Sequence, residues 1–160
     1  MLPPAEELKA AIERGVPGTV VTLDGPALYL EPQALLPVCR FLKSHPEYQL
    51  DYASNVTAVD YPPDPAGGGA GRIEMVYHLF SMAKKHGPVA IKVKLPRDNP
   101  RVPSLVPVYR GAEFQEREVF DLYGVQFDGH PDLRRILMWD GFQGYPMRKD
   151  YVPENQDAPA

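Results

Sequence analysis

The sequence predicts an α+β fold: a mostly antiparallel sheet covered by helices, of ferredoxin-like flavour, followed by a helix and a long extended C-terminal arm. Three observations support this prediction. Helical and strand periodicities follow one another in the order α-β-β-α-β-β-β-α. Apolar and polar residues alternate strictly from Val89 to Leu95, which is typical of a half-buried strand. Residues 125–151 show neither period.

Three helices are expected. Residues 5–14 form a short amphipathic helix that ends at Gly15. A second helix lies between Pro32 and Ser44 and starts near Gln33, because Pro37 is tolerated only in a first turn. The third covers residues 112–123 and ends at Gly124, a common C-terminal stop.

The strands are expected between these helices. Two short strands flank the turn at Asp24-Gly25, and a flexible hairpin loop rich in proline and glycine separates the next pair. The predicted strands cover residues 19–23, 27–30, 55–61, 72–81 and 89–95, and the loop covers 62–71. Residues 1–110 are thus predicted to form a sheet domain, residues 111–151 a helix and an arm, and residues 152–160 a flexible tail.

Composition excludes several classes of function. The chain has 160 residues, of which 44% are hydrophobic and 24% charged, with a formal net charge of −4. An acidic balance argues against a general nucleic-acid binder, which needs a basic face. Cys39 is the only cysteine, so a disulfide framework or a cysteine-ligated zinc or iron–sulfur site is not expected, and a reducing compartment fits. Neither a secretory signal nor an apolar run of ~20 residues is present, so we expect any membrane association to go through partners.

Glu116 is the anomaly of the third predicted helix. At 100° per residue it shares a face with Ala112, Val119, Phe120 and Tyr123. A carboxylate on a core-facing stripe is costly unless it is paired. An ion pair with Arg134 or Arg135 is the favoured interpretation; a general acid or base with a raised pKa and a contact to another chain are the alternatives.

The opposite face of that helix is predicted to be the charged, solvated one. It carries Arg117, Glu118 and Asp121, with Arg117 and Asp121 four residues apart. Phe114 on the same face would be an aromatic residue left in water, which is more useful in an interface than alone.

The arm, residues 125–151, mixes five aromatic residues with charges, glycines and prolines. A structureless segment of this length inside a domain is uncommon unless it is functional or disordered. Disorder is disfavoured, because the aromatic residues and the run Leu133–Met138 are costly to leave in water. The sequence therefore predicts an arm laid along a partner, with aromatic anchors and arginine clamps.

The histidines lack a catalytic or metal-binding context. His45, His78 and His86 have no partner at metal-ligand spacing. His130, in Gly-His-Pro, has no nucleophile or paired carboxylate beside it in sequence, so a turn and an interfacial hydrogen bond are expected. No catalytic, cofactor-binding or metal-binding residue is predicted.

These residues resemble a known signature. Glu116-Arg117-Glu118, Asp121-Leu122-Tyr123, and His130 followed four residues later by Arg134 are similar to the signature of the 30-kDa subunit family of complex I, the proton-pumping NADH:quinone oxidoreductase. The strings 129–137 and 146–151 resemble other hallmarks of that family, and 51–52 and 57–61 are similar too.

The resemblance implies a peripheral-arm subunit that packs on the 49-kDa subunit of the complex, on the cytoplasmic side of the membrane. FMN and iron–sulfur clusters would lie on partner subunits, with no cofactor on this chain. The partner interface would then use Phe114, Glu116, Arg117, Glu118, Asp121, His130, Arg134, Arg135, Trp139, Phe142, Tyr145, Arg148, Lys149 and Asp150.

Alternatives stay open at this point. Related subunits occur in membrane-bound hydrogenases and in ferredoxin-linked or F420-linked complexes, so the signature does not decide the electron donor. A stand-alone enzyme with Glu116, Asp121 and His130 as an acid–base set is a distant alternative. An RNA-binding module is disfavoured by the net charge.

Overall fold

The computed structural model describes residues 3–153. In chain order the elements are α1 (Ala5–Gly15), β1 (Thr22–Asp24), β2 (Ala27–Leu30), the 3-10 helix η1 (Pro32–Ala34), α2 (Leu35–Ser44), β3 (Tyr52–Tyr61), β4 (Arg72–Ser81), β5 (His86–Pro96), β6 (Arg101–Pro103), α3 (Ala112–Tyr123) and β7 (Gln126–Asp128). Within residues 3–153 no helix is long and apolar enough to cross a membrane.

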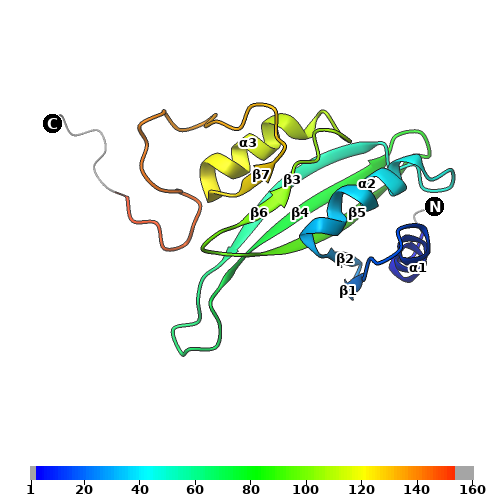
Figure 1. Ribbon diagram of the computed structural model, residues 1–160, viewed down its shortest axis with the longest axis horizontal. Helices are drawn as coiled ribbons and strands as arrows, with labels where there is room; N and C mark the ends of the chain where they lie inside the picture. Colours follow the sequence, from blue (N-terminus) through cyan, green and yellow to red (C-terminus); the bar gives the residue numbers. More distant parts are fainter. Residues whose placement is uncertain (1–2, 154–160) are drawn as a thin grey trace.

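The main sheet has five strands in the order β1-β2-β5-β4-β3. Only β2 and β5 pair in parallel; the other neighbours are antiparallel. Figure 1 shows α2 crossing the sheet near β5, α1 beside β1 and β2, and α3 beyond β3. The predicted fold class, a mostly antiparallel sheet covered by helices, is confirmed.

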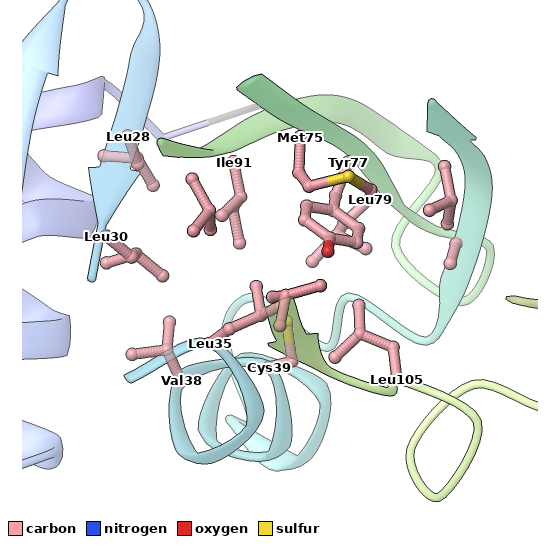
Figure 2. Close-up of a cluster of buried hydrophobic side chains, with 14 of the residues drawn as sticks. Leu28, Leu30, Leu35, Val38, Cys39, Met75, Tyr77, Leu79, Ile91 and Leu105 are labelled. Atoms are coloured by element: carbon pink, nitrogen blue, oxygen red, sulfur yellow. The ribbon is translucent and has the colours of Figure 1, made fainter. Parts of the chain in front are cut away.

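The core lies between one face of the sheet and the helices. Alternate residues of β4 and β5, from Ile73 to Leu79 and from Val89 to Leu95, point into it. Leu35, Val38 and Cys39 of α2 meet them from the other side (Figure 2). Ala112 and Val119 of α3 and Phe127 of β7 belong to the same core, so the signature helix is fixed by the sheet domain.

The free edge of β3 is protected by α3. The side-chain oxygen of Gln115 accepts a hydrogen bond from the backbone N–H of Val56 at 2.7 Å. An outward N–H of an edge strand otherwise offers a site for unwanted pairing with another chain. The first turns of α3 therefore both cover the sheet edge and fix the direction in which the helix leaves it.

Several element boundaries differ from the sequence prediction. α2 begins at Leu35 after a 3-10 turn rather than near Gln33, which still places Pro37 in its first turn. β3 starts three residues earlier than predicted, at Tyr52. The parallel pair of β6 and β7 was not predicted, because three-residue strands are too short to show a period.

The arm does not extend away from the domain. Residues 129–153 contain no helix or strand, and Figure 1 shows them looping beside α3 and β7. Their backbone and side chains bind α3, β3 and Arg97 of the same chain, as described below. Most of the predicted flexible tail, residues 154–160, lies outside the described residues.

Candidate subunit interface

Asp121 organises the start of the arm. Its carboxylate is fully buried and accepts hydrogen bonds from the backbone N–H groups of Ile136, Leu137 and Met138 at 3.0, 2.7 and 2.8 Å. Burial alone would raise its pKa, but these N–H donors and the Arg135 guanidinium outweigh burial and hold the pKa below its usual range. Three successive residues of the arm are thus fixed to one helical carboxylate.

Arg135 joins the same cluster from the arm. Its Nη1 donates to Asp121 Oδ1 at 2.6 Å, and its Nη2 donates to the carbonyl of Gly144 at 3.0 Å. The guanidinium carbon also lies 5.5 and 5.6 Å from the ring centroids of Phe142 and Tyr145. One arginine therefore ties two distant parts of the arm to each other and to α3.

Arg117 holds the arm through its backbone. Its Nε and Nη2 donate to the carbonyls of Arg134 and Arg135 at 3.1 and 2.9 Å. The prediction of a solvated charged face on α3 was therefore wrong for Arg117 and Asp121, which are both buried under the arm. It holds for Glu118, which is exposed, and for Phe114, which is 61% exposed.

The C-terminal end of α3 receives the far part of the arm. Gly124 caps the helix with φ +77, in the left-handed region, and Tyr145 packs so closely that an added Cβ would lie 2.6 Å from its ring. Met147 N donates to the carbonyl of Leu122, and Arg148 Nε to that of Tyr123 at 2.7 Å. The carbonyls that a helix leaves unsatisfied at its end thus bind the arm.

Glu116 has no arginine partner, and the predicted pair with Arg134 or Arg135 was wrong. Its carboxylate is fully buried and accepts from Ser104 Oγ and from the backbone N–H of Leu105, each at 2.6 Å. Burial raises the pKa of Glu116 to about 7, against the effect of these two hydrogen bonds. Arg135 was available to Asp121 instead because both lie on the arm side of α3, whereas Glu116 faces the sheet.

His130 links the helix to the turn that begins the arm. Its Nδ1 accepts the backbone N–H of Asp132 at 3.0 Å, which places the ring proton on Nε2, and Nε2 lies 3.0 Å from the carbonyl of Glu113. Nε2 is also 4.0 Å from Glu116, and neither side chain is exposed. The expected turn role is confirmed, whereas an interfacial hydrogen bond of His130 stays a prediction.

A second anchor near the end of the arm was missed by sequence reasoning. Arg97 binds Asp60 at 2.6 and 2.9 Å and Asp150 at 2.7 and 3.0 Å, and Asp60 also accepts the backbone N–H of Lys149. Arg97 holds the pKa of both aspartates below its usual range. Asp60 shares the inward face of β3 with Val56 and Ala58, so a carboxylate at an apolar position was the available signal.

The arm presents apolar side chains to solvent. Ten large hydrophobic side chains are exposed within residues 3–153, and half of them lie on the arm or directly after its end. These exposed residues are Ile136, Leu137, Trp139, Met147 and Val152. Phe142 contacts Trp139 edge-on at 4.9 Å and stacks near Tyr151 at 6.0 Å, so some predicted anchors also pack on one another.

The remaining predicted clamps are placed as follows. Arg134 is exposed and pairs with Asp132, Lys149 is exposed, and Asp150 binds Arg97. No group of three or more histidine, cysteine, aspartate or glutamate side chains within residues 3–153 is arranged to hold a metal ion. The absence of a cofactor from this chain stays a prediction.

The geometry defines a class of protein: an α+β domain whose last helix holds a looped C-terminal segment with its apolar side chains outward. The chain belongs to the family of the 30 kDa subunit of respiratory-chain NADH dehydrogenase, whose model matches residues 28–157.

Relatives and a solved structure agree with this membership. The chain is 45% identical over 125 residues to the second C-type subunit of the NADH-quinone oxidoreductase of Rhizobium meliloti, covering 78% of this chain and 65% of the relative. It is 46% identical over 129 residues to the C-type subunit of the same enzyme from Moorella thermoacetica, covering 81% of each. A chain of the membrane-bound sulfane sulfur reductase, an archaeal respiratory membrane complex, superimposes with a TM-score of 0.68 at 27% identity, covering 92% of this chain and 85% of that one. The chain spans less than two thirds of the length of several relatives, among them those of Rhizobium meliloti and Rhizobium etli.

Proposed function

We propose that the chain is a non-catalytic, peripheral-arm subunit of a membrane-associated NADH:quinone oxidoreductase. In this role it scaffolds the quinone-reducing module by packing its arm on the 49-kDa subunit, on the cytoplasmic side of the membrane. The observation that carries the proposal is the fixing of residues 136–138 by the buried Asp121 carboxylate, which leaves Ile136 and Leu137 facing outward.

The arm is prepared for binding before a partner arrives. Its course is fixed at three places: by Asp121 at its start, by the end of α3 in its middle and by Arg97 near its end. A segment that is already ordered loses less conformational entropy on association than a flexible one. Side chains such as Trp139, which is 52% exposed, can then act as anchors at low cost.

The signature residues are engaged in structure, which supports a non-catalytic role. Arg117 and Asp121 are buried and bound to the arm, and Glu116 is fully buried with both oxygens hydrogen-bonded. A stand-alone acid–base enzyme would need these groups within reach of a substrate. FMN, iron–sulfur clusters and the quinone chemistry are accordingly assigned to partner subunits, and membrane association to the same partners.

A second candidate has specific support. The structural similarity to a chain of a membrane-bound sulfane sulfur reductase makes an equivalent subunit of a related respiratory complex the alternative. The scaffolding role is the same in both cases, and only the donor and acceptor of the complex differ.

Affinity purification of the tagged chain from native membranes tests the proposal. We expect co-purification of a 49-kDa-type subunit and of subunits that carry flavin and iron–sulfur clusters, together with NADH:quinone reductase activity. Oxidation of another donor by the same preparation would select the second candidate. A chain recovered alone and monodisperse would contradict both.

A further inference from the structure

The second face of the sheet carries its own organised set of side chains. The helices bury their apolar residues in the core on the first face, where the odd-numbered residues of β4 and β5 point. The alternate residues point the opposite way and form cross-strand rows. One row joins Val59, Glu74 and Lys94, and the next joins Thr57, Val76, Lys92 and Tyr29. We call the set Tyr29, Val59, Tyr61, Arg72, Glu74, Val76, Lys92 and Lys94 the second sheet face.

The charges of this face differ in sign from those of the whole chain. It holds three cations, Arg72, Lys92 and Lys94, against one carboxylate, Glu74, whereas the chain has a formal net charge of −4. Glu31, which borders the same hollow as Lys94 at the end of β2, reduces the excess to one positive charge. The second sheet face is therefore a positive region on an acidic protein.

The single carboxylate is enclosed and neutralised. Glu74 is 1% exposed, accepts from the Tyr29 hydroxyl at 2.8 Å, and lies 3.2 Å from Lys92 Nζ and 3.4 Å from Arg72 Nε. Burial opposes its ionisation, but these three partners hold the pKa of Glu74 below its usual range. The negative charge is thus kept beneath the cations and is not offered to a partner.

The cations are held by aromatic rings rather than left free. The Nζ atoms of Lys92 and Lys94 lie 5.4 and 4.6 Å from the centroid of Tyr29, and the Arg72 guanidinium lies 4.0 Å from that of Tyr61. Lys94 is exposed and makes no ion pair with any of residues 3–153. A cation fixed over a ring loses less side-chain entropy when a carboxylate reaches it.

We propose that the second sheet face is a second docking surface, which receives an acidic surface of another subunit and pairs a partner carboxylate with Lys94. The inference rests on the proposed function in that the partner belongs to the same complex. Because this face lies on the side of the sheet opposite the helical layer, the chain would bridge two surfaces rather than cap one.

A protein partner fits this face better than the other anionic surfaces do. Attraction to anionic lipid headgroups typically takes a cluster of four to eight lysines and arginines. The second sheet face has three, and two of them share Glu74. Val59, 37% exposed, adds apolar area beside the cations, and a mixed apolar and charged composition is typical of protein interfaces.

Zero-length cross-linking of the assembled complex tests the inference. The tagged complex is treated with a carbodiimide, which joins a lysine amine directly to a carboxylate, and cross-linked peptides are identified by mass spectrometry. We expect Lys94 to be joined to an aspartate or glutamate of another subunit and to lose its reactivity toward acetic anhydride on assembly. The variants Lys94→Glu and Lys94→Gln should lose the cross-link and release the partner at lower salt. Lys84→Glu, an equal charge change in the exposed turn between β4 and β5, is the control and should behave as wild type.

Two outcomes would overturn the inference. One is a complex that co-purifies normally while Lys94 reacts equally in the complex and in the isolated chain; the arm proposal would survive that result. The other is pelleting of the isolated chain with phosphatidylglycerol vesicles that Lys94→Glu abolishes, which would assign the face to lipid.

Discussion

The carboxylate of Asp121 lies 2.6 Å from the guanidinium of Arg135 and at the same time accepts three backbone N–H groups of the arm. A single buried anion thereby fixes the segment that displays the outward apolar residues. This relationship joins the stability of the chain to its proposed function, and it leads to predictions about both.

Asp121→Asn is expected to lower the free energy of unfolding by about 3 kcal/mol. The substitution removes the charge opposite Arg135 and turns an amide NH₂ toward backbone donors, so a mostly buried cation loses its partner. Urea unfolding at neutral pH measures the effect. Asp140→Asn, at an exposed position of the same arm, is the control and should change stability by less than about 0.5 kcal/mol. Equal effects of the two substitutions would contradict the anchoring role of Asp121.

Glu116 should make stability depend on pH between about 4.5 and 7. Because its pKa is about 7 in the folded chain and near 4.5 when unfolded, the folded state binds more protons in this window. Its contribution is complete below the unfolded pKa and is lost as pH rises to the folded one, an effect of roughly 3 kcal/mol at 1.36 kcal/mol per pKa unit.

Glu116→Gln should remove that dependence. The free energy of unfolding is measured from pH 5 to 8, a window above the lowered pKa values of Asp60, Asp121 and Asp150. Wild type should lose stability relative to Glu116→Gln as pH rises. Parallel pH profiles of the two proteins would show that Glu116 does not titrate in this range.

Gly124→Ala should destabilise the chain for two separable reasons. An alanine at φ +77 is strained by about 1 kcal/mol, and its Cβ would meet the ring of Tyr145 at 2.6 Å. Adding Tyr145→Ala should relieve the steric part but not the backbone part, as a double-mutant cycle in urea unfolding would show. Gly111→Ala, where φ is −64 and the space is open, should be neutral or stabilising. Additive effects of Gly124→Ala and Tyr145→Ala would exclude the close contact.

Arg97→Ala should release the end of the arm. The amide of Lys149 is bonded to Asp60, which Arg97 holds in place, so its protection from hydrogen exchange should fall sharply. The amides of 136–138, bound to Asp121, should keep theirs. Arg40→Ala on the exposed side of α2 serves as the control. Unchanged exchange at Lys149 would mean that Arg97 is not the anchor.

The sheet and helices could be predicted because their patterns repeat. The alternation in β5 and the glycine stop of α3 each reflect a local physical rule, and both elements lie where expected. The strands β6 and β7 could not be predicted, since three residues give no period and their pairing joins positions 25 residues apart, as from Arg101 to Gln126.

The site was predictable in its residues but not in its contacts. Glu116 was expected to be buried from its place on an apolar stripe, and it is. Its partners, Ser104 and Leu105, come from a loop whose position no periodicity fixes. Arg135 was expected at Glu116 and is found at Asp121, because pairing depends on which side of α3 the arm covers.

The central claim is that the apolar side chains of the arm dock on a partner subunit. The most direct test is the double variant Leu137→Asp, Trp139→Asp in the full chain, expressed with a tag in native membranes. Both side chains are more than half exposed, at 58 and 52%, so the isolated variant should unfold at the wild-type urea concentration. The matched control is Val20→Asp, Met82→Asp, at side chains exposed by 69 and 64% elsewhere on the molecule. We predict that the arm variant loses its co-purifying 49-kDa-type subunit and the quinone reductase activity, whereas the control keeps both. Normal assembly and activity of the arm variant would contradict the account.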